Sequence, residues 1–473
     1  MANLTPNGWD TDDNITAGEQ ARWARDANGN LCMVDPDNEQ QAVYVAQLAT
    51  DAFRKVRGNV HTKRPWHSAT FSGITAGYTV HNVIALESLY DAVRLCYSQI
   101  NGLTTSGIKA CIAPSAKVNN YRDPVDDLSA SAAWSNVTFN NSGANGNAPS
   151  PAGSTVSSGT IPAGSGTAAA ILESHYFSDW IPTFSYARGD SGETFPLLFM
   201  RNYFPNAQAY GVNPGGTIQG DWINDPSVHD GRIITSAIQS VDGVSTPANF
   251  TNGAKDQGWI GASAIQYISR YRGLSVHAIG DSITRGQSTQ GNKDSGKGFR
   301  PWGHIACKRM SRLDRPVTFA NWGISGQTTP NTIQRHKAII ENYSPDVVFI
   351  WPYSLNDGPP ATMAAAANGM FQARAAIQLC LANGAIPVIC TATPGALTGA
   401  AETVRQAVND EVRNWYSTGL IICDFDAAIR DPYNISQMKQ ALRFDNWHPN
   451  EAGHEAMADV AQAALQKVFD YYF

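Results

Sequence analysis

The chain lacks several features that would point to whole classes of protein. It has no apolar run approaching the roughly 18 residues that a membrane span requires. It has no basic excess either, since 34 Lys and Arg face 40 Asp and Glu, a net charge of −6. Residues 1–7 lack the basic and apolar regions of a secretion signal. We therefore expect no membrane span, no nucleic-acid partner and a cytoplasmic or particle-borne protein, such as a phage component, rather than an exported one.

Cysteines are few and scattered. The seven lie far apart, without a Cys-x-x-Cys pair, and most occur within apolar runs. Zinc sites need more closely spaced ligands, so no metal is expected. The pattern predicts small buried side chains in a protein made in a reducing compartment.

The first half of the chain divides into two regions that differ in composition and in the spacing of apolar residues. Its 473 residues and 42% apolar content suggest two or three domains with sizeable cores. Residues 1–60 are polar, and the spacing of apolar residues over 41–53 predicts an N-terminal helical arm. Residues 61–272 contain short alternating runs between Gly, Pro, Asn and Ser, which predict a β-sandwich accessory domain of jelly-roll type. Within it, the low-complexity stretch 140–166 is expected to be a long loop.

Residues 273–473 alternate between apolar runs and longer helical patterns. Strands are expected at 274–279, 317–321, 347–351, 387–391 and 421–425, and helices at 304–312, 329–342, 361–383, 400–418 and from 450. This order predicts an α/β fold, a flavodoxin-like three-layer α/β/α domain with a five-stranded parallel sheet. In such domains the site lies beyond the carboxyl ends of the strands.

Chemically useful residues follow these expected strands. Ser282 comes just after the first, and a serine needs a base and donors for the substrate oxyanion. Gly326 follows the second strand and offers a backbone N–H, and Asn356 follows the third with a side-chain amide. Near the C-terminus Asp445 precedes His448 by three residues, a spacing that lets the carboxylate orient the imidazole.

The four blocks in this order, Gly-Asp-Ser, glycine, asparagine and Asp-x-x-His, resemble those of the SGNH, or GDSL-type, hydrolases over residues 273–473. The resemblance implies ester hydrolysis with Ser282 as nucleophile, His448 as general base and then acid, and Asp445 orienting His448. It implies an oxyanion hole formed by the backbone N–H groups of Ser282 and Gly326 and the Asn356 amide. It implies no cofactor and no metal.

One position departs from the family pattern, because Ser354 stands where a glycine usually precedes the asparagine by two places. This serine is expected to tighten the loop or to add a hydroxyl near the site. Asp281 and Trp447 are further candidates to line the substrate pocket. Gly323 is a competing but less favoured candidate for the oxyanion hole. Asp357 is expected to be a turn residue, and His277 and His454 are expected to be packed histidines.

The substrate is less constrained than the reaction. No long apolar insertion offers a lid or acyl tunnel, and the β-rich region looks like the accessory domains of SGNH carbohydrate esterases. We therefore expect short acyl groups, such as acetyl, on a carbohydrate, or another small ester. Tryptophans that could stack on sugar rings are Trp180, Trp222, Trp259, Trp302 and Trp447. The alternatives are a lipolytic esterase or thioesterase on medium acyl chains, and a non-catalytic glycan-binding or phage structural protein.

Overall fold

In the computed structural model, contacts divide the chain into two compact units, residues 1–56 with 147–149 and residues 57–146 with 150–473. The structure describes residues 22–25, 31–34, 42–44, 59–64, 71–74, 77–99, 104–115, 134–139, 156–167, 170–172, 174–183, 196–205, 208–210, 233–246, 254–256, 261–288, 301–357 and 362–472.

The described residues of the first unit form strands rather than helices. Strands β1 (Arg22–Arg25), β2 (Leu31–Val34) and β3 (Ala42–Tyr44) pair antiparallel in that order. The predicted helical arm is wrong at these positions, since β3 occupies the start of the expected helix. Val and Tyr favour an extended backbone once a partner strand is available, and pairing with β2 overrides the helical spacing. The rest of 41–53 lies outside the described residues.

Two antiparallel sheets occupy the second unit before residue 272. The larger has the order β10-β8-β15-β6-β17-β18 with β9 on β8, and the smaller has the order β13-β7-β19-β4 with β14 on β7. Two further strand pairs are β5 with β16 and β11 with β12. The bounds are β4 Val60–Lys63, β5 Phe71–Ile74, β6 Tyr78–Ala85, β7 Tyr90–Gln99, β8 Thr105–Ser115, β9 Ser135–Asn136, β10 Gly159–Ile161, β11 Ser165–Thr167, β12 Ala170–Leu172, β13 Ser174–Phe177, β14 Ile181–Pro182, β15 Leu197–Phe204, β16 Gln208–Tyr210, β17 Ile233–Gln239, β18 Ala254–Asp256 and β19 Ala264–Ser269.

The two sheets share one apolar core. Alternate residues of β7, Val93, Leu95 and Tyr97, are fully buried and belong to the same cluster as Ile112 and Met200 of the larger sheet. The alternation predicted for this strand is therefore confirmed, as are the antiparallel sheets. The expected loop over 140–166 is wrong at its end, where β10 and β11 form. Glycine and threonine there pair with neighbouring strands despite the low complexity of the sequence.

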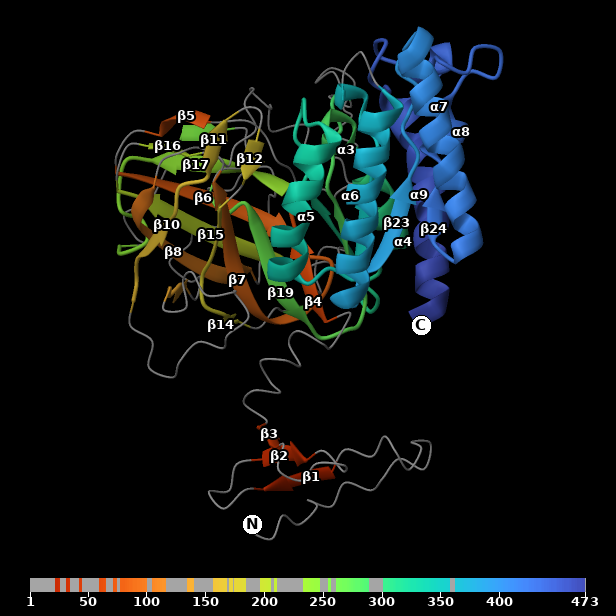
Figure 1. Cartoon of the computed structure of the whole chain (residues 1–473). Helices are drawn as coiled ribbons and strands as arrows, with labels where there is room; N and C mark the ends of the chain where they lie inside the picture. Colours follow the sequence, from red (N-terminus) through yellow and green to blue (C-terminus); the bar gives the residue numbers. More distant parts are fainter. Residues whose placement is uncertain are drawn as a thin grey trace. The chain divides into compact units, whose positions relative to one another are not determined.

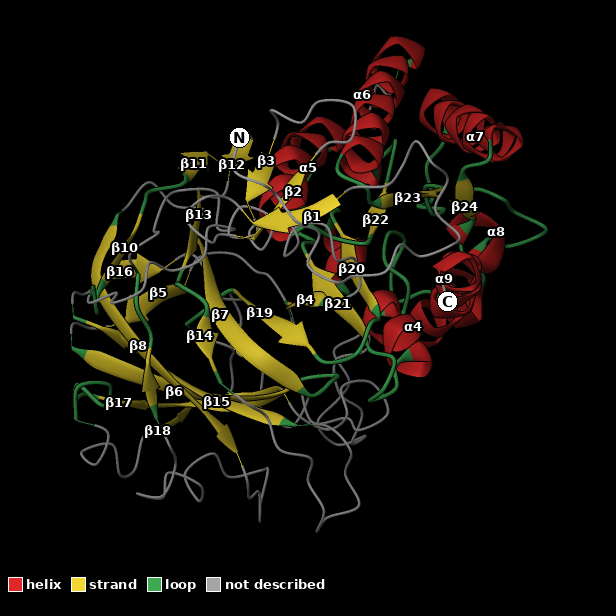
Figure 2. Cartoon of the chain, turned by 90° about the horizontal axis from the view of Figure 1, so that it is seen from below, coloured by secondary structure: helices red, strands yellow, loops and turns green. Residues whose placement is uncertain are grey.

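The predicted five-stranded parallel sheet is confirmed, with the order β21-β20-β22-β23-β24. Its helices form two rows, α4 with α9 and α5 with α6 and α7, and Figure 2 shows the strands between them. The bounds are β20 Leu274–Ala278, α3 Ser282–Arg285, α4 Trp302–Met310, β21 Val317–Asn321, α5 Thr329–Tyr343, β22 Val347–Ile350, η4 Leu355–Asp357, α6 Met363–Ala382, β23 Ile386–Cys390, α7 Gly399–Asn414, η5 Trp415–Thr418, β24 Ile421–Cys423, α8 Phe425–Ile429, η6 Gln440–Leu442 and α9 Glu451–Tyr472.

The antiparallel part lies beside the parallel part (Figure 1), and its strand β4 contacts the edge strand β21 of the parallel sheet (Figure 2). Just after β4, the Arg64 backbone accepts a hydrogen bond from Asn321 N–H at 3.1 Å and donates one to Phe319 O at 3.4 Å. The Arg64 guanidinium lies 3.9 Å from the centre of the Trp322 ring. The edge strand β21 is therefore hydrogen-bonded to the segment after β4 rather than open. Arg64 of that segment also contacts Trp322, at the start of the loop that follows β21.

The core of the parallel part is built around Trp302. Its ring is fully buried and packs edge-on against Phe319, Phe349 and Trp351. The expectation that Trp302 offers a sugar-stacking surface is therefore wrong, because the indole fills the space between α4 and the sheet. Trp222 and Trp259 lie outside the described residues.

The predictions for cysteines and membrane spans can be compared with the described residues. Cys96, Cys111, Cys307, Cys380, Cys390 and Cys423 are all buried and free, as the apolar runs around them predicted. Among the helices in the described ranges, none combines the length and the hydropathy needed to span a bilayer.

Candidate active site

The candidate nucleophile lies at a sharp turn between β20 and the four-residue helix α3. Ser282 is the first residue of that helix and is 7% exposed. The Asp281 carboxylate caps the helix by accepting the Ile283 N–H at 2.9 Å. Gly280 cannot be replaced without movement, since a Cβ there would lie 2.1 Å from the Thr284 hydroxyl oxygen. The turn thus fixes Ser282 beyond the carboxyl end of β20.

Ser282, His448 and Asp445 form a continuous hydrogen-bonded set. The Ser282 Oγ lies 3.0 Å from His448 Nε2, and His448 Nδ1 lies 2.9 Å from Asp445 Oδ2. Asp445 Oδ1 also accepts the backbone N–H groups of Trp447 and His448, both at 2.7 Å. This geometry lets the imidazole take the serine proton while the carboxylate holds the imidazole in one orientation.

Asp445 is held in its charged form. Partial burial raises the pKa of its carboxyl, but the hydrogen bonds from the His448 ring and from two backbone N–H groups outweigh that effect. The pKa of Asp445 therefore lies below its ordinary value, and the carboxylate is available to stabilise an imidazolium.

The loop after β21 contains the two glycines that compete for the oxyanion role. The Gly323 N–H already donates to Asn321 Oδ1 at 3.0 Å, and a Cβ there would meet the Arg285 nitrogen at 2.2 Å. Gly326 is exposed, has φ +76, and would have no atom within 4 Å of a Cβ. Within the described residues the Gly326 N–H has no acceptor, so its geometry favours it over Gly323.

Asn356 lies on the short turn η4, and its amide faces the loop that contains Gly326. Its Nδ2 donates to Gln327 O at 3.1 Å and contacts Ser354 Oγ at 3.3 Å. Asp357, predicted to be a turn residue, does more than that. Its carboxylate accepts the Thr329 N–H and hydroxyl, both at 2.7 Å, and the Ser354 N–H at 3.0 Å. Asp357 thereby locks the loops after β21 and β22 together, a role that depends on residues 28 positions away.

Trp447, the other predicted pocket residue, flanks the candidate site. Its side chain is 42% exposed, next to His448 in sequence. A Cβ on Gly395 would lie 3.3 Å from the Trp447 ring and 2.6 Å from Leu355. Leu355 and Trp447 therefore pack closely on Gly395, and the Trp447 ring keeps an accessible surface.

His454 and His277 lie beneath the site rather than in it. His454 Nδ1 accepts the Trp302 backbone N–H at 3.3 Å, and His277 Nδ1 accepts the Trp322 indole N–H at 3.1 Å. Burial lowers the pKa of each to about 3. Both are neutral packing groups, in line with the structural roles expected for them.

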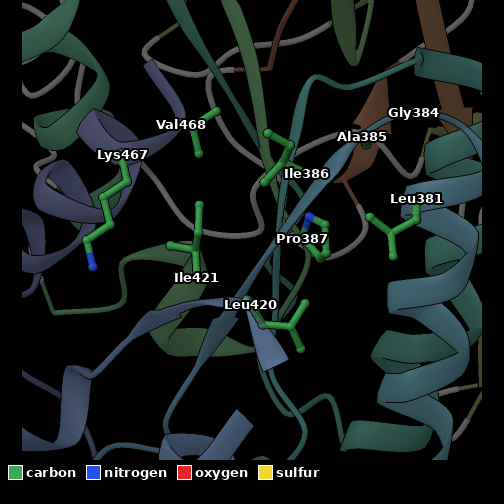
Figure 3. A pocket seen from close by; sticks show the side chains of 10 residues that line it. Leu381, Gly384, Ala385, Ile386, Pro387, Leu420, Ile421, Lys467 and Val468 are labelled. Carbon is green, nitrogen blue, oxygen red and sulfur yellow. The ribbon is translucent and has the colours of Figure 1, made fainter. Parts of the chain in front are cut away.

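A cavity of about 560 Å³ opens at the amino ends of strands β23 and β24 (Figure 3). Its lining includes Ile386 and Ile421, which begin β23 and β24, and Lys467 of α9. Because the strands are parallel, their amino ends lie on the side of the sheet away from their carboxyl ends. The cavity is therefore not part of the candidate site. The described residues contain no group of three His, Cys, Asp or Glu side chains arranged to hold a metal ion.

A parallel α/β/α sheet with a linked serine, histidine and aspartate at its carboxyl edge is the arrangement of a serine hydrolase. Residues 278–456 match the model of the GDSL-like Lipase/Acylhydrolase family. The chain therefore carries a domain of that family, as its four sequence blocks predicted.

Solved structures that resemble the chain cover about two fifths of it. A member of the lipolytic protein G-D-S-L family from Veillonella parvula shares 19% identity and covers 41% of this chain and 98% of its own, with a TM-score of 0.33. A GDSL-like lipase from Bacteroides thetaiotaomicron shares 17% (41% and 88% coverage, TM-score 0.32). The acetylxylan esterase Axe2 from Geobacillus stearothermophilus, as a catalytic mutant, shares 18% (41% and 94%, TM-score 0.32). No curated protein matches the chain in sequence.

Proposed function

We propose that this chain is a serine esterase that removes short acyl groups, acetyl in the simplest case, from a carbohydrate. The observation that carries the proposal is the contact of 3.0 Å between Ser282 Oγ and His448 Nε2, continued at 2.9 Å to Asp445. A serine so placed can attack an ester carbonyl and form an acyl-enzyme, which water then hydrolyses.

In the proposed mechanism His448 takes the Ser282 proton during attack and gives it to the departing alcohol. The Gly326 and Ser282 N–H groups stabilise the oxyanion together with the Asn356 amide, which exchanges its hydrogen bond to Gln327 O for one to the oxyanion. His448 then activates water to release the acid. Each group in this scheme belongs to the chain itself, and each step moves one proton between oxygen and His448 Nε2.

The preference for a small acyl group on a sugar rests on the surroundings of His448. Leu355 and Trp447 pack closely on Gly395, and we infer that an acyl site next to them has room for a short chain rather than a long one. The exposed face of Trp447 offers an apolar surface of the kind on which sugar rings stack. Phage or other particle-borne deacetylation is the context that we propose for the chain.

A series of 4-nitrophenyl esters from acetate to octanoate tests the acyl preference. We expect kcat/KM to be highest for acetate and to fall by about tenfold or more by six carbons, since a crowded pocket must be distorted to admit extra methylenes. Acetate release from a panel of acetylated polysaccharides then identifies the carbohydrate. A rate maximum at six carbons or more would instead favour a lipolytic esterase or thioesterase.

Asn356→Ala is expected to lower kcat by about 10²–10³-fold, because the variant loses a side-chain donor to the oxyanion. KM should change little, since the substrate carbonyl is weakly charged before attack. Asn383→Ala is the control, since Asn383 Nδ2 donates to Leu379 O at 2.9 Å at the exposed end of α6, away from the site. Equal kcat values in the two variants would remove Asn356 from the proposed mechanism.

A further inference from the structure

The hydroxyl of Ser354 occupies the centre of a small hydrogen-bond network at the candidate site. Its Oγ lies 2.6 Å from Asp281 Oδ2, 3.2 Å from the Asn356 backbone nitrogen and 3.3 Å from Asn356 Nδ2. A serine hydroxyl has one hydrogen to donate and two lone pairs that accept. A fourth contact, 3.1 Å to Gln327 O, is with a second acceptor. The single hydrogen is directed to the nearer and charged Asp281 carboxylate, and the backbone and side-chain N–H groups of Asn356 are directed to the two lone pairs of the oxygen.

The network joins the residue before the candidate nucleophile to the candidate oxyanion donor, which are far apart in sequence. Asp281 immediately precedes the candidate nucleophile and caps its helix, whereas Asn356 is the candidate oxyanion donor. Ser354 is 6% exposed and Asn356 is exposed, so the network has a buried centre and an amide at the surface of the site. A hydroxyl that donates to a carboxylate becomes a better acceptor, which strengthens its hold on the amide.

We propose that Ser354 is a positioning residue, which orients the Asn356 amide and couples it to the Asp281 carboxylate beside the nucleophile. This inference rests on the proposed esterase function of the same site. A glycine at 354 would leave both the amide and the carboxylate without this partner. Ser354, which replaces the glycine of the family pattern, therefore helps to hold the candidate site in its working geometry.

The link also affects the ionisation of Asp281. Its carboxylate faces the Ser354 hydroxyl, the Ile283 N–H, the His448 ring and, with the same charge, Asp357. Burial raises the pKa of Asp281, and the Ser354 hydroxyl is the foremost of the groups that oppose this rise. Removing the hydroxyl is expected to raise the pKa of Asp281 further. The protonated form would no longer stabilise a positive charge on His448 during turnover.

The test compares Ser354→Ala with Ser263→Ala on 4-nitrophenyl acetate. Both variants lose one buried hydroxyl, since Ser263 Oγ donates to Cys96 O at 2.9 Å in the antiparallel part. For Ser354→Ala we expect kcat to fall about tenfold, the effect of one hydrogen bond to a charged group, with KM within about twofold. The acid limb of its kcat/KM profile should move to higher pH. Ser263→Ala should keep the kcat, KM and pH profile of the unmodified chain.

Ser354→Thr retains the hydroxyl and is expected to recover most of the lost kcat, and thermal unfolding confirms that each variant is folded. Equal kcat and equal acid limbs in Ser354→Ala and the unmodified chain would overturn this inference and leave the esterase function standing. An unmodified chain that hydrolyses no ester would overturn the proposed function, and the inference with it.

Discussion

Ser282→Ala is expected to abolish ester hydrolysis, with kcat falling by about 10⁴–10⁶-fold. No other side chain can then form the acyl-enzyme, and only the binding and oxyanion contributions remain. The hydroxyl contacts His448 but holds no other described element in place, so the fold should persist. Hydrolysis of 4-nitrophenyl acetate measures the loss, and mass spectrometry after a short reaction should find an acetylated protein only when Ser282 is present.

Ser417→Ala is the matched control for this variant. Ser417 Oγ donates to Asn414 O at 2.8 Å on the exposed turn η5, and its loss should leave kcat unchanged. Activity above about 1% in Ser282→Ala would mean that another residue attacks the ester, and the proposed mechanism would then be wrong.

The buried strands and long helices of the parallel part could be predicted from the sequence because the signal is local. Runs such as 317–321 and 347–351 are mostly apolar, as is typical of strands covered on both faces. The helices between them show apolar residues at helical spacing. The predicted start of β21 matches the observed one, and that of the last helix differs by one residue. The helix α3 has only four residues, too few for any periodic pattern, and was not predicted.

What could not be predicted depends on partners distant in sequence. The Ser354 hydroxyl donates a hydrogen bond to Asp281, 73 positions away, and Asp357 accepts one from Thr329, 28 positions away. The sequence favoured Gly326 over Gly323, but the packing of Gly323 against Arg285 that supports this preference could not be predicted. Strand β3 replaced a predicted helix because a neighbouring strand was available to pair with it. In each case the deciding interaction is tertiary.

The loop that carries Gly326 is anchored from both parts of the second unit. Trp322, four residues earlier, donates through its indole N–H to His277, accepts the Arg335 guanidinium at its carbonyl oxygen at 2.8 Å, and packs under Arg64. Arg64 belongs to the segment that extends β4 of the antiparallel part. This part therefore does more than cover an edge, since one of its side chains supports the base of a candidate catalytic loop.

Mild acid is expected to destabilise the fold well before its carboxylates protonate. Burial lowers the pKa of His277 and His454 to about 3 and that of His336 to about 4. Each is neutral when folded but binds a proton near pH 6.5 when unfolded, so the stability it contributes is full above pH 6.5 and declines as pH falls toward its folded pKa. At pH 5 the loss is about 2 kcal/mol for each histidine, about 6 kcal/mol together.

The midpoint of urea unfolding, followed by tryptophan fluorescence between pH 7.5 and 5, measures this loss. Asp445 and Asp424, whose pKa values lie below their ordinary value, contribute only at lower pH, whereas the raised pKa of Asp281 acts in the opposite direction. His454→Asn keeps an acceptor for the Trp302 N–H but removes one titrating group. Its stability should therefore fall less steeply with pH, by about a third. An unfolding midpoint that is constant from pH 7.5 to 5, or an unchanged slope in His454→Asn, would show that these histidines are not the neutral core groups that their burial requires.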